Sequence, residues 1–432
     1  MTRQIHDVIV AGAGIAGMES AINLANQGFK VLVIDKNPSI GGRMISLSKV
    51  FPTLDCSSCI TTPKMAEAAH HDNITLMTYT EIGEIRKNGG LFEVTVVKKS
   101  RFVNEKSCTG CRMCEDVCPV VVPHEFDQGL GARKAIYVPF TTAVPQYAVL
   151  DIKSCIYCGK CLQACPTEPK SVDYSIQDEQ QVLEARSIIL ATGFNPTEIN
   201  RKKEYHDGVN FKNVVSALQM ERLLAPSGPY GGVCRLSDGK EPENIAFVHC
   251  AGSRDESIGV PYCSRVCCMF SIKQAMLLSG SLPLANITLY YMDIRAFGKN
   301  YEQFFQNAKA MGISFIKAKV AKIDELPGGD LSLSIEALED TGARSKVVHD
   351  LVVLASGMLP GWDAHNARGI GVDGDGFVVS RFPKEDPAVT HVEGLFVAGT
   401  AAGPKDIVDS IMEAGSAAMK ATRYLSGIKV PS

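Results

Sequence analysis

The 432-residue sequence lacks long apolar runs, a strong charge bias and a secretory leader. No apolar run approaches the roughly 20 residues that a helix needs to cross a bilayer, so we expect no membrane span. The formal net charge is −3 and 21% of residues are charged, which argues against nucleic acid or an anionic membrane as the main partner. The N-terminal residues lead directly into a strand pattern, without a signal peptide. These absences predict a cytoplasmic protein.

Common hydrolytic sites are absent too, whereas cysteine is abundant. We find no Ser-His-Asp set, no zinc-hydrolase pattern and no obvious acid–base pair for a substrate. The chain has fifteen cysteines, an odd number, many of them at short repeated spacings. Because thiols stay reduced in the cytosol, this usage indicates metal or redox chemistry rather than disulfides.

A dinucleotide-binding pattern opens the chain. Three glycines with GxGxxG spacing lie between an apolar strand and an amphipathic helix, and an acid ends the next strand. Such glycines let the backbone approach a pyrophosphate at the helix N-terminus, and the acid accepts hydrogen bonds from ribose hydroxyls. The residues predicted to bind a dinucleotide here are Gly12, Gly14, Gly17 and Asp35.

Later glycines indicate which dinucleotide. A Gly-Gly pair follows Asp35, a strand ends in Ala-Thr-Gly, and a late strand runs into Ala-Gly-Thr before a helix. This set resembles the two-dinucleotide-fold flavoproteins of the thioredoxin-reductase type, whose N-terminal fold and C-terminal segment close on one FAD. The late Ala-Gly of that family precedes an Asp that contacts the ribityl chain, and Thr replaces it here. The resemblance implies FAD contacts from Gly41, Gly42, Thr192, Gly193, Gly399 and Thr400.

Two copies of C-x₂-C-x₂-C-x₃-C-P lie inside this flavin fold. In two-cluster ferredoxins, three cysteines of each copy bind one [4Fe–4S] cluster and the fourth binds the other. We therefore assign one cluster to Cys108, Cys111, Cys114 and Cys165, and the second to Cys155, Cys158, Cys161 and Cys118. We expect this insert to lie close to the flavin fold, and residues 126–146 between the motifs to be ordered and to pack on a neighbour.

Four more cysteines occupy a site where many flavoenzymes have a second glycine loop. They follow an apolar strand and lead into a helix from about 266 to 278, and Asp293 ends the next strand. Because the GxGxxG pattern is missing here, we interpret Asp293 as a relic or a cap rather than a ribose ligand. The cysteines are Cys250, Cys263, Cys267 and Cys268.

Four interpretations of these cysteines are open. They are buried apolar side chains, a dithiol–disulfide couple, a zinc site or the ligands of a third iron–sulfur cluster. A disulfide between adjacent cysteines would be strained, and two clusters are already predicted, so we favour the cluster. Arg254 and Arg265 then offset its negative charge, or they form surface ion pairs.

Several segments together resemble the flavin-containing iron–sulfur subunit of heterodisulfide reductase. They are CSRVCCMFSIKQA, GLGARKAIYVPFTTAVPQ, FPTLDCSSCITTPKM, YYMDIRAFGKNYEQF and AGTAAGPKDIVDSI. The resemblance implies a thioredoxin-reductase-like core with FAD, an inserted two-cluster ferredoxin and an extra cluster at the Cys…Cys…Cys-Cys site. It also implies a catalytic role for Lys273 near the flavin N5, where its charge would stabilise the anionic reduced flavin. The alternative is a solvated helix lysine.

The resemblance also implies partners. Members of this family work in hetero-oligomeric complexes with other redox subunits, and larger members perform electron bifurcation, in which electron pairs are split between two acceptors. This chain begins at the flavin fold and stops after the flavin-closing helix, without the flanking cluster domains of the long forms. We therefore expect this chain to lack relay clusters that full bifurcation would use.

Three cysteines fall outside these patterns. Cys56 and Cys59 form a CxxC, for which a redox dithiol, a cluster shared with a partner and two buried thiols are equally good hypotheses. We interpret Cys234, which stands alone, as structural.

The sequence thus predicts an α/β, thioredoxin-reductase-like flavoprotein with two dinucleotide-binding domains and an inserted α+β two-[4Fe–4S] ferredoxin domain. Its predicted function is electron transfer between a two-electron flavin and one-electron clusters in a heterodisulfide-reductase-like complex. The alternatives are a self-sufficient NAD(P)H-dependent oxidoreductase and a docking subunit with a vestigial FAD site. The predicted segments are 1–101 and 173–240 (flavin domain), 102–172 (ferredoxin insert), 241–335 (degenerate NAD(P)-like domain with the third cysteine group) and 336–432 (C-terminal part of the flavin domain).

Overall fold

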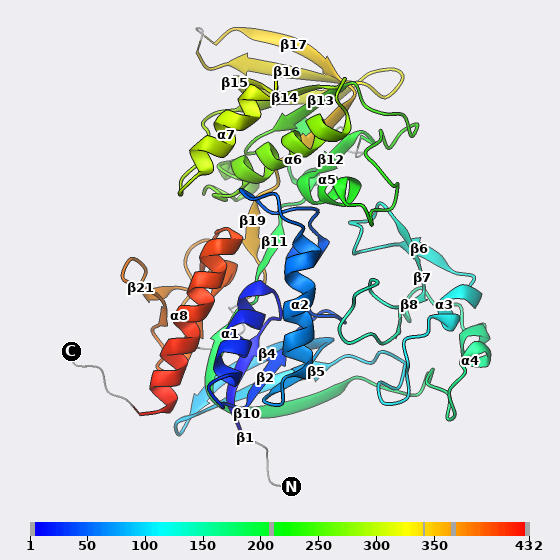
Figure 1. Cartoon of the computed structure of the whole chain (residues 1–432), viewed down its shortest axis with the longest axis vertical. Coiled ribbons are helices and arrows are strands. Elements are labelled where there is room, and N and C mark those ends of the chain that lie inside the picture. Colours follow the sequence, from blue (N-terminus) through cyan, green and yellow to red (C-terminus); the bar gives the residue numbers. More distant parts are fainter. Residues whose placement is uncertain (1–4, 207–210, 340–341, 364–368, 428–432) are drawn as a thin grey trace. The chain divides into compact units, whose positions relative to one another are not determined.

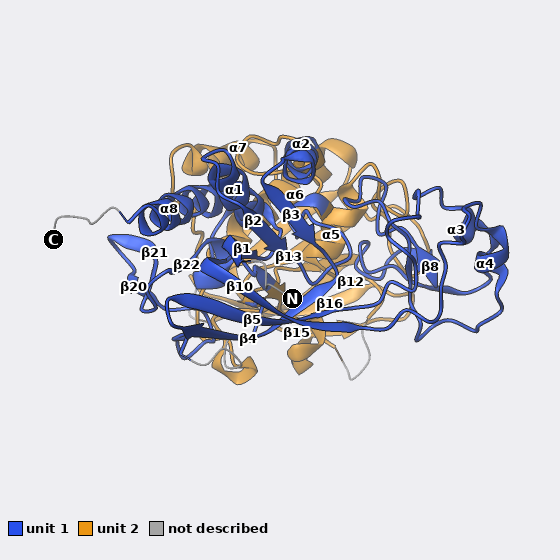
Figure 2. Cartoon of the chain, turned by 90° about the horizontal axis from the view of Figure 1, so that it is seen from below, with its two compact units in different colours: residues 1–45, 59–194, 360–432 blue, residues 46–58, 195–359 orange. Residues whose placement is uncertain are grey.

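The computed structural model describes residues 5–206, 211–339, 342–363 and 369–427 (Figure 1). The chain forms two compact units, which are coloured separately in Figure 2. Unit 1 comprises Met1–Ile45, Cys59–Phe194 and Pro360–Ser432, and unit 2 comprises Ser46–Ser58 and Asn195–Leu359. Two short strands, β11 (Phe194–Pro196) and β19 (Met358–Pro360), occur where the chain passes between the units. None of the described helices is both long and apolar enough to cross a bilayer.

Unit 1 is built on a twisted sheet whose central strands run parallel in the order β22-β10-β1-β2-β3. The long strand β10 continues past this core and pairs antiparallel with β5. The helices are α1 (Ile15–Ala25), α2 (Ser57–His70) and α8 (Ile407–Leu425). The strands are β1 (Ile5–Ala11), β2 (Val31–Ile34), β3 (Ile74–Met77), β4 (Thr80–Asn88), β5 (Leu91–Lys98), β10 (Glu179–Leu190), β20 (Ser380–Phe382), β21 (Asp386–Thr390) and β22 (Leu395–Val397).

The sequence of β1 explains why this sheet is buried on both faces. Side chains of a strand alternate between faces, so Val8 and Val10 pack in one core and Ile9 and Ala11 in another. The first core is closed by α1 and α8, which pack against each other, and the second by residues of β4 and β5. A strand covered on both sides has a continuous apolar sequence rather than an alternating one.

The insert with the two cysteine motifs is part of unit 1 and has a small core of its own. Its elements are α3 (Met113–Val117), α4 (Lys160–Ala164), β6 (Val121–Pro123), β7 (Ala132–Lys134), β8 (Ile136–Tyr137) and β9 (Val149–Leu150). The helices α3 and α4 contact each other. Cys118 and Cys161 lie in this core with Ile136 and Val138.

The segment between the motifs is fastened to the flavin-type fold, as predicted. Phe126 and Phe140 stack on each other and pack against the core beneath α1 and α8. Ile40 donates its backbone N–H to the Val144 carbonyl at 2.9 Å, and Val144 donates its own to Ser39 Oγ at 2.9 Å. These bonds hold the insert directly beside the segment that leads into Gly41 and Gly42.

Unit 2 contains a sheet in the order β12-β18-β13-β14-β15-β16-β17, parallel through β15 and antiparallel beyond it. Its helices α5, α6 and α7 pack side by side (Figure 1). The helices are α5 (Ala217–Leu224), α6 (Cys267–Ser281) and α7 (Tyr301–Ala310). The strands are β12 (Val214–Ser216), β13 (Asn244–Val248), β14 (Asn286–Tyr291), β15 (Ser314–Glu325), β16 (Leu331–Ala337), β17 (Arg344–His349) and β18 (Leu351–Leu354).

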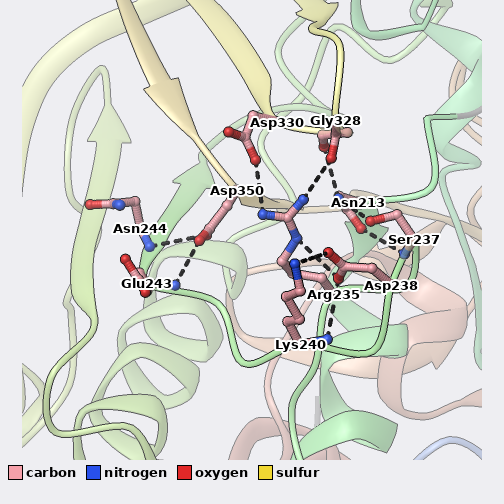
Figure 3. A network of polar contacts seen from close by, with 11 residues as sticks. Asn213, Arg235, Ser237, Asp238, Lys240, Glu243, Asn244, Gly328, Asp330 and Asp350 are labelled. Carbon is pink, nitrogen blue, oxygen red and sulfur yellow. Dashed lines mark hydrogen bonds and ion pairs between the residues drawn. The ribbon is translucent and has the colours of Figure 1, made fainter.

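A polar network anchors the segment around Cys234 in unit 2 (Figure 3). The Arg235 guanidinium donates to Asp330 and to the Gly328 carbonyl, both at 2.9 Å. Asp350 accepts hydrogen bonds from the backbone N–H groups that open β13. Cys234 is half-buried beside these ion pairs, and burial raises the pKa of its thiol. These surroundings fit a structural residue.

Candidate functional site

The glycine loop of unit 1 follows β1 and leads into α1. Gly14 is the N-cap of that helix and has no side chain with which to cap it. A Cβ on Gly17 would lie 1.8 Å from the Gly12 carbonyl oxygen, so no other residue fits at position 17. The first turn of α1 thus has no side-chain cap, which suits the pyrophosphate site that the glycine pattern predicts.

Asp35 lies just past β2 and is buried. Its carboxylate accepts the Ala13 N–H of the glycine loop at 2.7 Å and the Asn37 N–H at 2.8 Å. Burial raises the pKa of Asp35, and these hydrogen bonds counter the rise. The predicted ribose ligand therefore also holds the glycine loop in shape, which the sequence pattern did not indicate.

The other predicted flavin contacts of unit 1 converge on this loop. A Cβ on Gly12 would lie 2.2 Å from the Ala191 carbonyl oxygen, and one on Gly42 would lie 2.7 Å from Gly14 Cα. A Cβ on Gly399 would lie 2.8 Å from Ala16 Cβ. The segments that carry the predicted flavin contacts therefore lie together at the carboxyl ends of parallel strands, where such folds bind ligands. The predicted contacts are Gly12, Gly14, Gly17, Asp35, Gly41, Gly42, Thr192, Gly193, Gly399 and Thr400.

Sequence reasoning missed a carboxylate at the C-terminal glycine. Glu413 of α8 accepts the Gly399 N–H at 3.1 Å and pairs with Lys405 at 2.5 Å. Gly399, the residue before Thr400, thus bonds a carboxylate that lies 14 residues further along the chain, in a helix whose sequence shows no glycine motif. Only the return of α8 toward the sheet brings the two together.

Several cysteines of the insert lie close enough together to affect one another's pKa. Burial is the main cause that raises the pKa of the Cys114 thiol to about 12, and the nearby Cys108 and Cys111 thiols contribute. Burial also raises the pKa of Cys161, with contributions from Cys155 and from Cys118 of the other motif. The pairing of Cys118 with the second motif is the crossing expected of a two-cluster ferredoxin.

Cys165 is set apart by hydrogen bonds. Burial alone would raise the pKa of its thiol, but the Thr167 hydroxyl and nearby backbone N–H groups, including that of Ser171, lower it to about 7. Stabilising the thiolate suits a metal ligand.

The two insert motifs also share an unusual backbone. The residue two after the first cysteine is left-handed in both copies, Gly110 in one and Tyr157 in the other. In the second copy the Tyr157 N–H donates to Cys155 Sγ at 3.3 Å. A non-glycine residue in this conformation is strained and persists where the surroundings enforce it. Its effect here is to aim an N–H group at a sulfur.

The third cysteine group lies in unit 2, in the loop between β13 and α6. The twelve residues between Cys250 and Cys263 fold back on themselves, because Asp255 and Val260 form an antiparallel bridge. The Cys250, Cys267 and Cys268 side chains are buried. Burial and the Cys268 and Cys263 thiols raise the pKa of Cys250 to about 11, and Cys267 interacts with the other three. The fold therefore gathers all four cysteines.

Part of this loop repeats the insert's geometry. Arg265, two residues after Cys263, is left-handed with φ 59°, and its N–H donates to Cys263 Sγ at 3.3 Å. Tyr157 stands in the same relation to Cys155, with φ 55°. Two segments with unrelated spacing thus present a cysteine sulfur in the same way.

Charged residues next to this group add to the sequence interpretation. Asp293 lies two residues beyond the end of β14 and pairs with Arg254 at 2.6 Å, a role that the interpretation as a relic or a cap did not include. Arg254 also donates to Cys250 Sγ at 3.9 Å. The Arg265 guanidinium lies over the Phe297 ring.

Lys273 is buried on α6, so the alternative of a solvated helix lysine is wrong. Its ammonium donates to Glu221 of α5 at 2.5 Å and to the Lys49 carbonyl at 2.8 Å. Glu221 also accepts from Gln274 and from the Ser48 N–H and hydroxyl. No sequence pattern pointed to Glu221, which lies 52 residues before its partner. Whether Lys273 has a catalytic role stays a prediction.

The CxxC pair is only partly buried. Cys59 is exposed and Cys56 half-buried, so the hypothesis of two buried thiols is wrong. Lys49 and Cys56 form an isolated bridge at the start of α2, which shapes the turn before the helix. Among the residues that the structure describes, no three His, Cys, Asp or Glu side chains are arranged so that they could share one metal ion; a [4Fe–4S] cluster instead binds each of its cysteines to a different iron.

Two family models match parts of the chain. A 4Fe-4S dicluster domain matches residues 107–169, which contain both insert motifs. An NAD(P)-binding Rossmann-like domain matches residues 10–60, which contain the glycine loop and Asp35. The chain therefore has a two-cluster iron–sulfur domain and a dinucleotide-binding fold.

Solved structures confirm the fold class. Thioredoxin reductase from T. acidophilum matches with a TM-score of 0.54 at 17% identity and covers 99% of this chain and 100% of its own. The bacillithiol disulfide reductase from Bacillus cereus matches with a TM-score of 0.52 at 15% identity, over 97% and 100%. At these identities the likeness concerns the fold alone.

Curated relatives match almost the whole chain, and they are the A-type subunits of heterodisulfide reductases. The one from the H(2):CoB-CoM heterodisulfide,ferredoxin reductase of Methanothermobacter marburgensis is 44% identical over 96% of this chain. Its H(2)/formate-linked counterpart from Methanococcus maripaludis is 46% identical over 95%. This chain spans 63% of the length of each of these relatives. On this similarity, together with the shared iron–sulfur and dinucleotide-binding domains, the chain belongs to the family of iron–sulfur flavoproteins that includes these heterodisulfide reductase subunits.

Proposed function

We propose that this chain is an oxidoreductase subunit that transfers electrons between FAD and iron–sulfur clusters. Flavin exchanges two electrons and each cluster exchanges one, so such a chain converts between the two kinds of chemistry. The observation that carries the proposal is the attachment of the insert beside Gly41 and Gly42, through Ser39, Ile40 and Val144. An electron carrier fixed at the edge of a flavin site is the arrangement that this conversion needs.

The proposed FAD ligands are the converging residues of unit 1. The glycine loop and the α1 N-terminus would hold the pyrophosphate, and Asp35 would accept from ribose. Thr400 would face the ribityl chain with a hydroxyl in place of the family's carboxylate. Because Glu413 already places a negative charge on the Gly399 N–H, a second carboxylate at position 400 would add repulsion. That supports a working site rather than a vestigial one.

The proposed clusters number three. The insert would hold two, with the ligands assigned from its spacing. Cys250, Cys263, Cys267 and Cys268 would hold the third, and the repeated Cys–x–left-handed geometry at Cys263 supports this over zinc or a dithiol. The proposal keeps the predicted segment boundaries, with the third cysteine group in the segment 241–335.

The proposed role of Lys273 is supported by its burial and by its ion pair with Glu221. An ammonium buried with a single carboxylate is costly to maintain and is found where it serves a purpose. The pair also fixes the backbone of Ser48 and Lys49, in the segment Ser46–Ser58 that continues from the flavin-type fold. We propose that Glu221 sets the position and charge of Lys273 for its role toward the flavin.

The partners are proposed from the names of the relatives. Those proteins are named as single subunits of heterodisulfide reductases, and one of them belongs to the ferredoxin:CoB-CoM heterodisulfide reductase of Methanosarcina mazei. We propose that this chain works with other redox subunits of such a complex, which would carry the substrate chemistry. Electron bifurcation is a further hypothesis that depends on those subunits.

Measuring iron, sulfide and flavin in protein purified without oxygen tests the proposal. We expect about twelve irons and one FAD per chain, as three [4Fe–4S] clusters and one flavin require. About eight irons with one FAD would refute the third cluster and favour the hypothesis that its four cysteines form a dithiol–disulfide couple. Protein that binds no flavin after reconstitution would overturn the electron-conversion function itself.

A further inference from the structure

The loop with the third cysteine group contains a guanidinium aimed at a sulfur. Arg254 Nη1 lies 3.9 Å from Cys250 Sγ and 2.6 Å from Asp293 Oδ1. Cys250 is buried, whereas Arg254 is 27% exposed in its side chain. The charge therefore reaches a buried sulfur from the edge of the loop.

The backbone of Arg254 is fixed as firmly as its side chain. Arg254 is left-handed with φ 58°, and its N–H donates to the Tyr262 carbonyl at 2.9 Å. The next residue, Asp255, pairs with Lys202 at 2.8 Å and bridges to Val260. A strained backbone held from both sides indicates that the direction of this side chain matters.

Asp293 takes a position that nucleotide-binding folds give to a ribose ligand. It follows β14, the second strand of the β13-α6-β14 motif, as Asp35 follows β2 of the β1-α1-β2 motif in unit 1. Its carboxylate holds Arg254 and, at 3.5 Å, Arg295. An acid at the position of the ribose ligand thus orients a cation toward the cysteine group.

We propose that Arg254, oriented by Asp293, raises the reduction potential of the cluster held by Cys250, Cys263, Cys267 and Cys268; this rests on the proposed function, because it needs that cluster. Reduction adds one electron to the cluster, and no bond forms or breaks. The added negative charge extends onto the ligand sulfurs, so a charged donor at Cys250 stabilises the reduced form more than the oxidised form. Arg254 keeps its proton throughout.

The test is a redox titration of the full chain, reconstituted without oxygen and followed by electron paramagnetic resonance. In Arg254→Gln we expect the ratio of reduced to oxidised third cluster to fall about tenfold at a fixed potential, a shift of about 59 mV to more negative values for a one-electron couple. The insert clusters should keep their potentials. Arg254→Lys should shift the third cluster in the same direction by less, because it keeps the positive charge but loses the guanidinium geometry that places Nη1 against both Asp293 and Cys250.

Arg265→Gln is the matched control, since it removes the same charge from the same loop and leaves the backbone N–H to Cys263 intact. We expect a smaller shift from it. An equal shift in the control would overturn the proposal, as would a wild-type potential in the Arg254 variants. If Arg254→Gln does not bind the third cluster, the potential of that cluster in Arg254→Lys alone tests the proposal. About eight irons in the unmodified chain would refute the third cluster instead, a different outcome.

Discussion

Both units contain a strand–loop–helix motif at which nucleotide-binding folds place a glycine loop, but the two loops have different residues. In unit 1, a three-glycine loop joins β1 to α1, and the backbone around Gly12 and Gly17 is so close that neither position has room for a Cβ. In unit 2, β13 passes through a long loop with four cysteines into α6. The topology fixes where each site lies, and the loop residues decide what it holds.

The two loops also share an acidic neighbour, which is Asp35 after β2 in unit 1 and Asp293 after β14 in unit 2. Asp35 bonds the backbone of the glycine loop, and Asp293 pairs with Arg254 of the cysteine loop. Asp35 thus bonds the loop between β1 and α1, and Asp293 bonds the loop between β13 and α6. The acid therefore has the same position in the two motifs and a different partner in each.

The largest effect is expected from emptying the cysteine loop. Cys267→Ala or Cys268→Ala should lower the iron content by about four per chain, because a thiolate ligand of a [4Fe–4S] cluster is lost. Iron analysis after anaerobic reconstitution measures this. Cys234→Ala, at a half-buried cysteine outside the group, should keep all the iron. An unchanged iron content in the first two variants would sink the third cluster.

The glycine loop should be just as sensitive to one methyl group. Gly17→Ala should abolish flavin retention, because its Cβ would lie 1.8 Å from the Gly12 carbonyl oxygen. Flavin absorbance per chain measures this. The control is Gly415→Ala in α8, where a Cβ meets nothing within 4 Å and helix propensity should stabilise by about 0.5–1 kcal/mol. Full flavin in Gly17→Ala would mean that the loop does not bind it.

Unit 2 can also be probed through its buried ion pair. Glu221→Gln should lower the free energy of unfolding by about 3–5 kcal/mol, because it leaves the Lys273 ammonium buried without a counter-charge. Denaturant unfolding measures the change. Glu393→Gln removes a largely exposed partner of Lys87 and should change little. Equal effects would show that the buried pair contributes no more than a surface one.

The same pair predicts a pH dependence. Burial alone would raise the pKa of Glu221, but Lys273 and the hydrogen bonds from Gln274 and Ser48 lower it below its ordinary value. The unfolded chain then binds the proton more readily, so this stability is present above about pH 4.3 and is lost as the pH falls through the folded pKa. Unfolding curves measured from about pH 5 downward into the acid range should show the loss, and Glu221→Gln should flatten that part of the profile.

The smallest effect is expected from pyridine nucleotides. NADH or NADPH should not bleach the flavin rapidly, because the cysteine loop lacks the GxGxxG pattern that cradles a pyrophosphate and Asp293 is engaged by Arg254. Stopped-flow absorbance of the flavin measures this. Rapid bleaching would favour the self-sufficient NAD(P)H oxidoreductase over an electron-transfer subunit.

Features that depend on short spacing could be predicted from the amino-acid sequence. The two four-cysteine motifs, the glycine loop and the strands around them are each encoded by residues that are close neighbours along the chain. Chain connectivity keeps such residues together in any fold that forms, so their spacing predicts their chemistry. The same reasoning located the third cysteine group, although the bridge between Asp255 and Val260 that closes its twelve-residue gap was not visible.

The pairing of distant charges, in contrast, emerged from the tertiary structure. Glu221 and Lys273 lie 52 residues apart, and Arg254 and Asp293 lie 39 apart. Such pairs depend on the register of strands and on which helix faces pack together, and neither is written in local periodicity. A buried lysine and a solvated one look alike in sequence because the residues that bury Lys273 come from other elements. The sequence identifies the chemical groups of this protein, and long-range packing determines their partners.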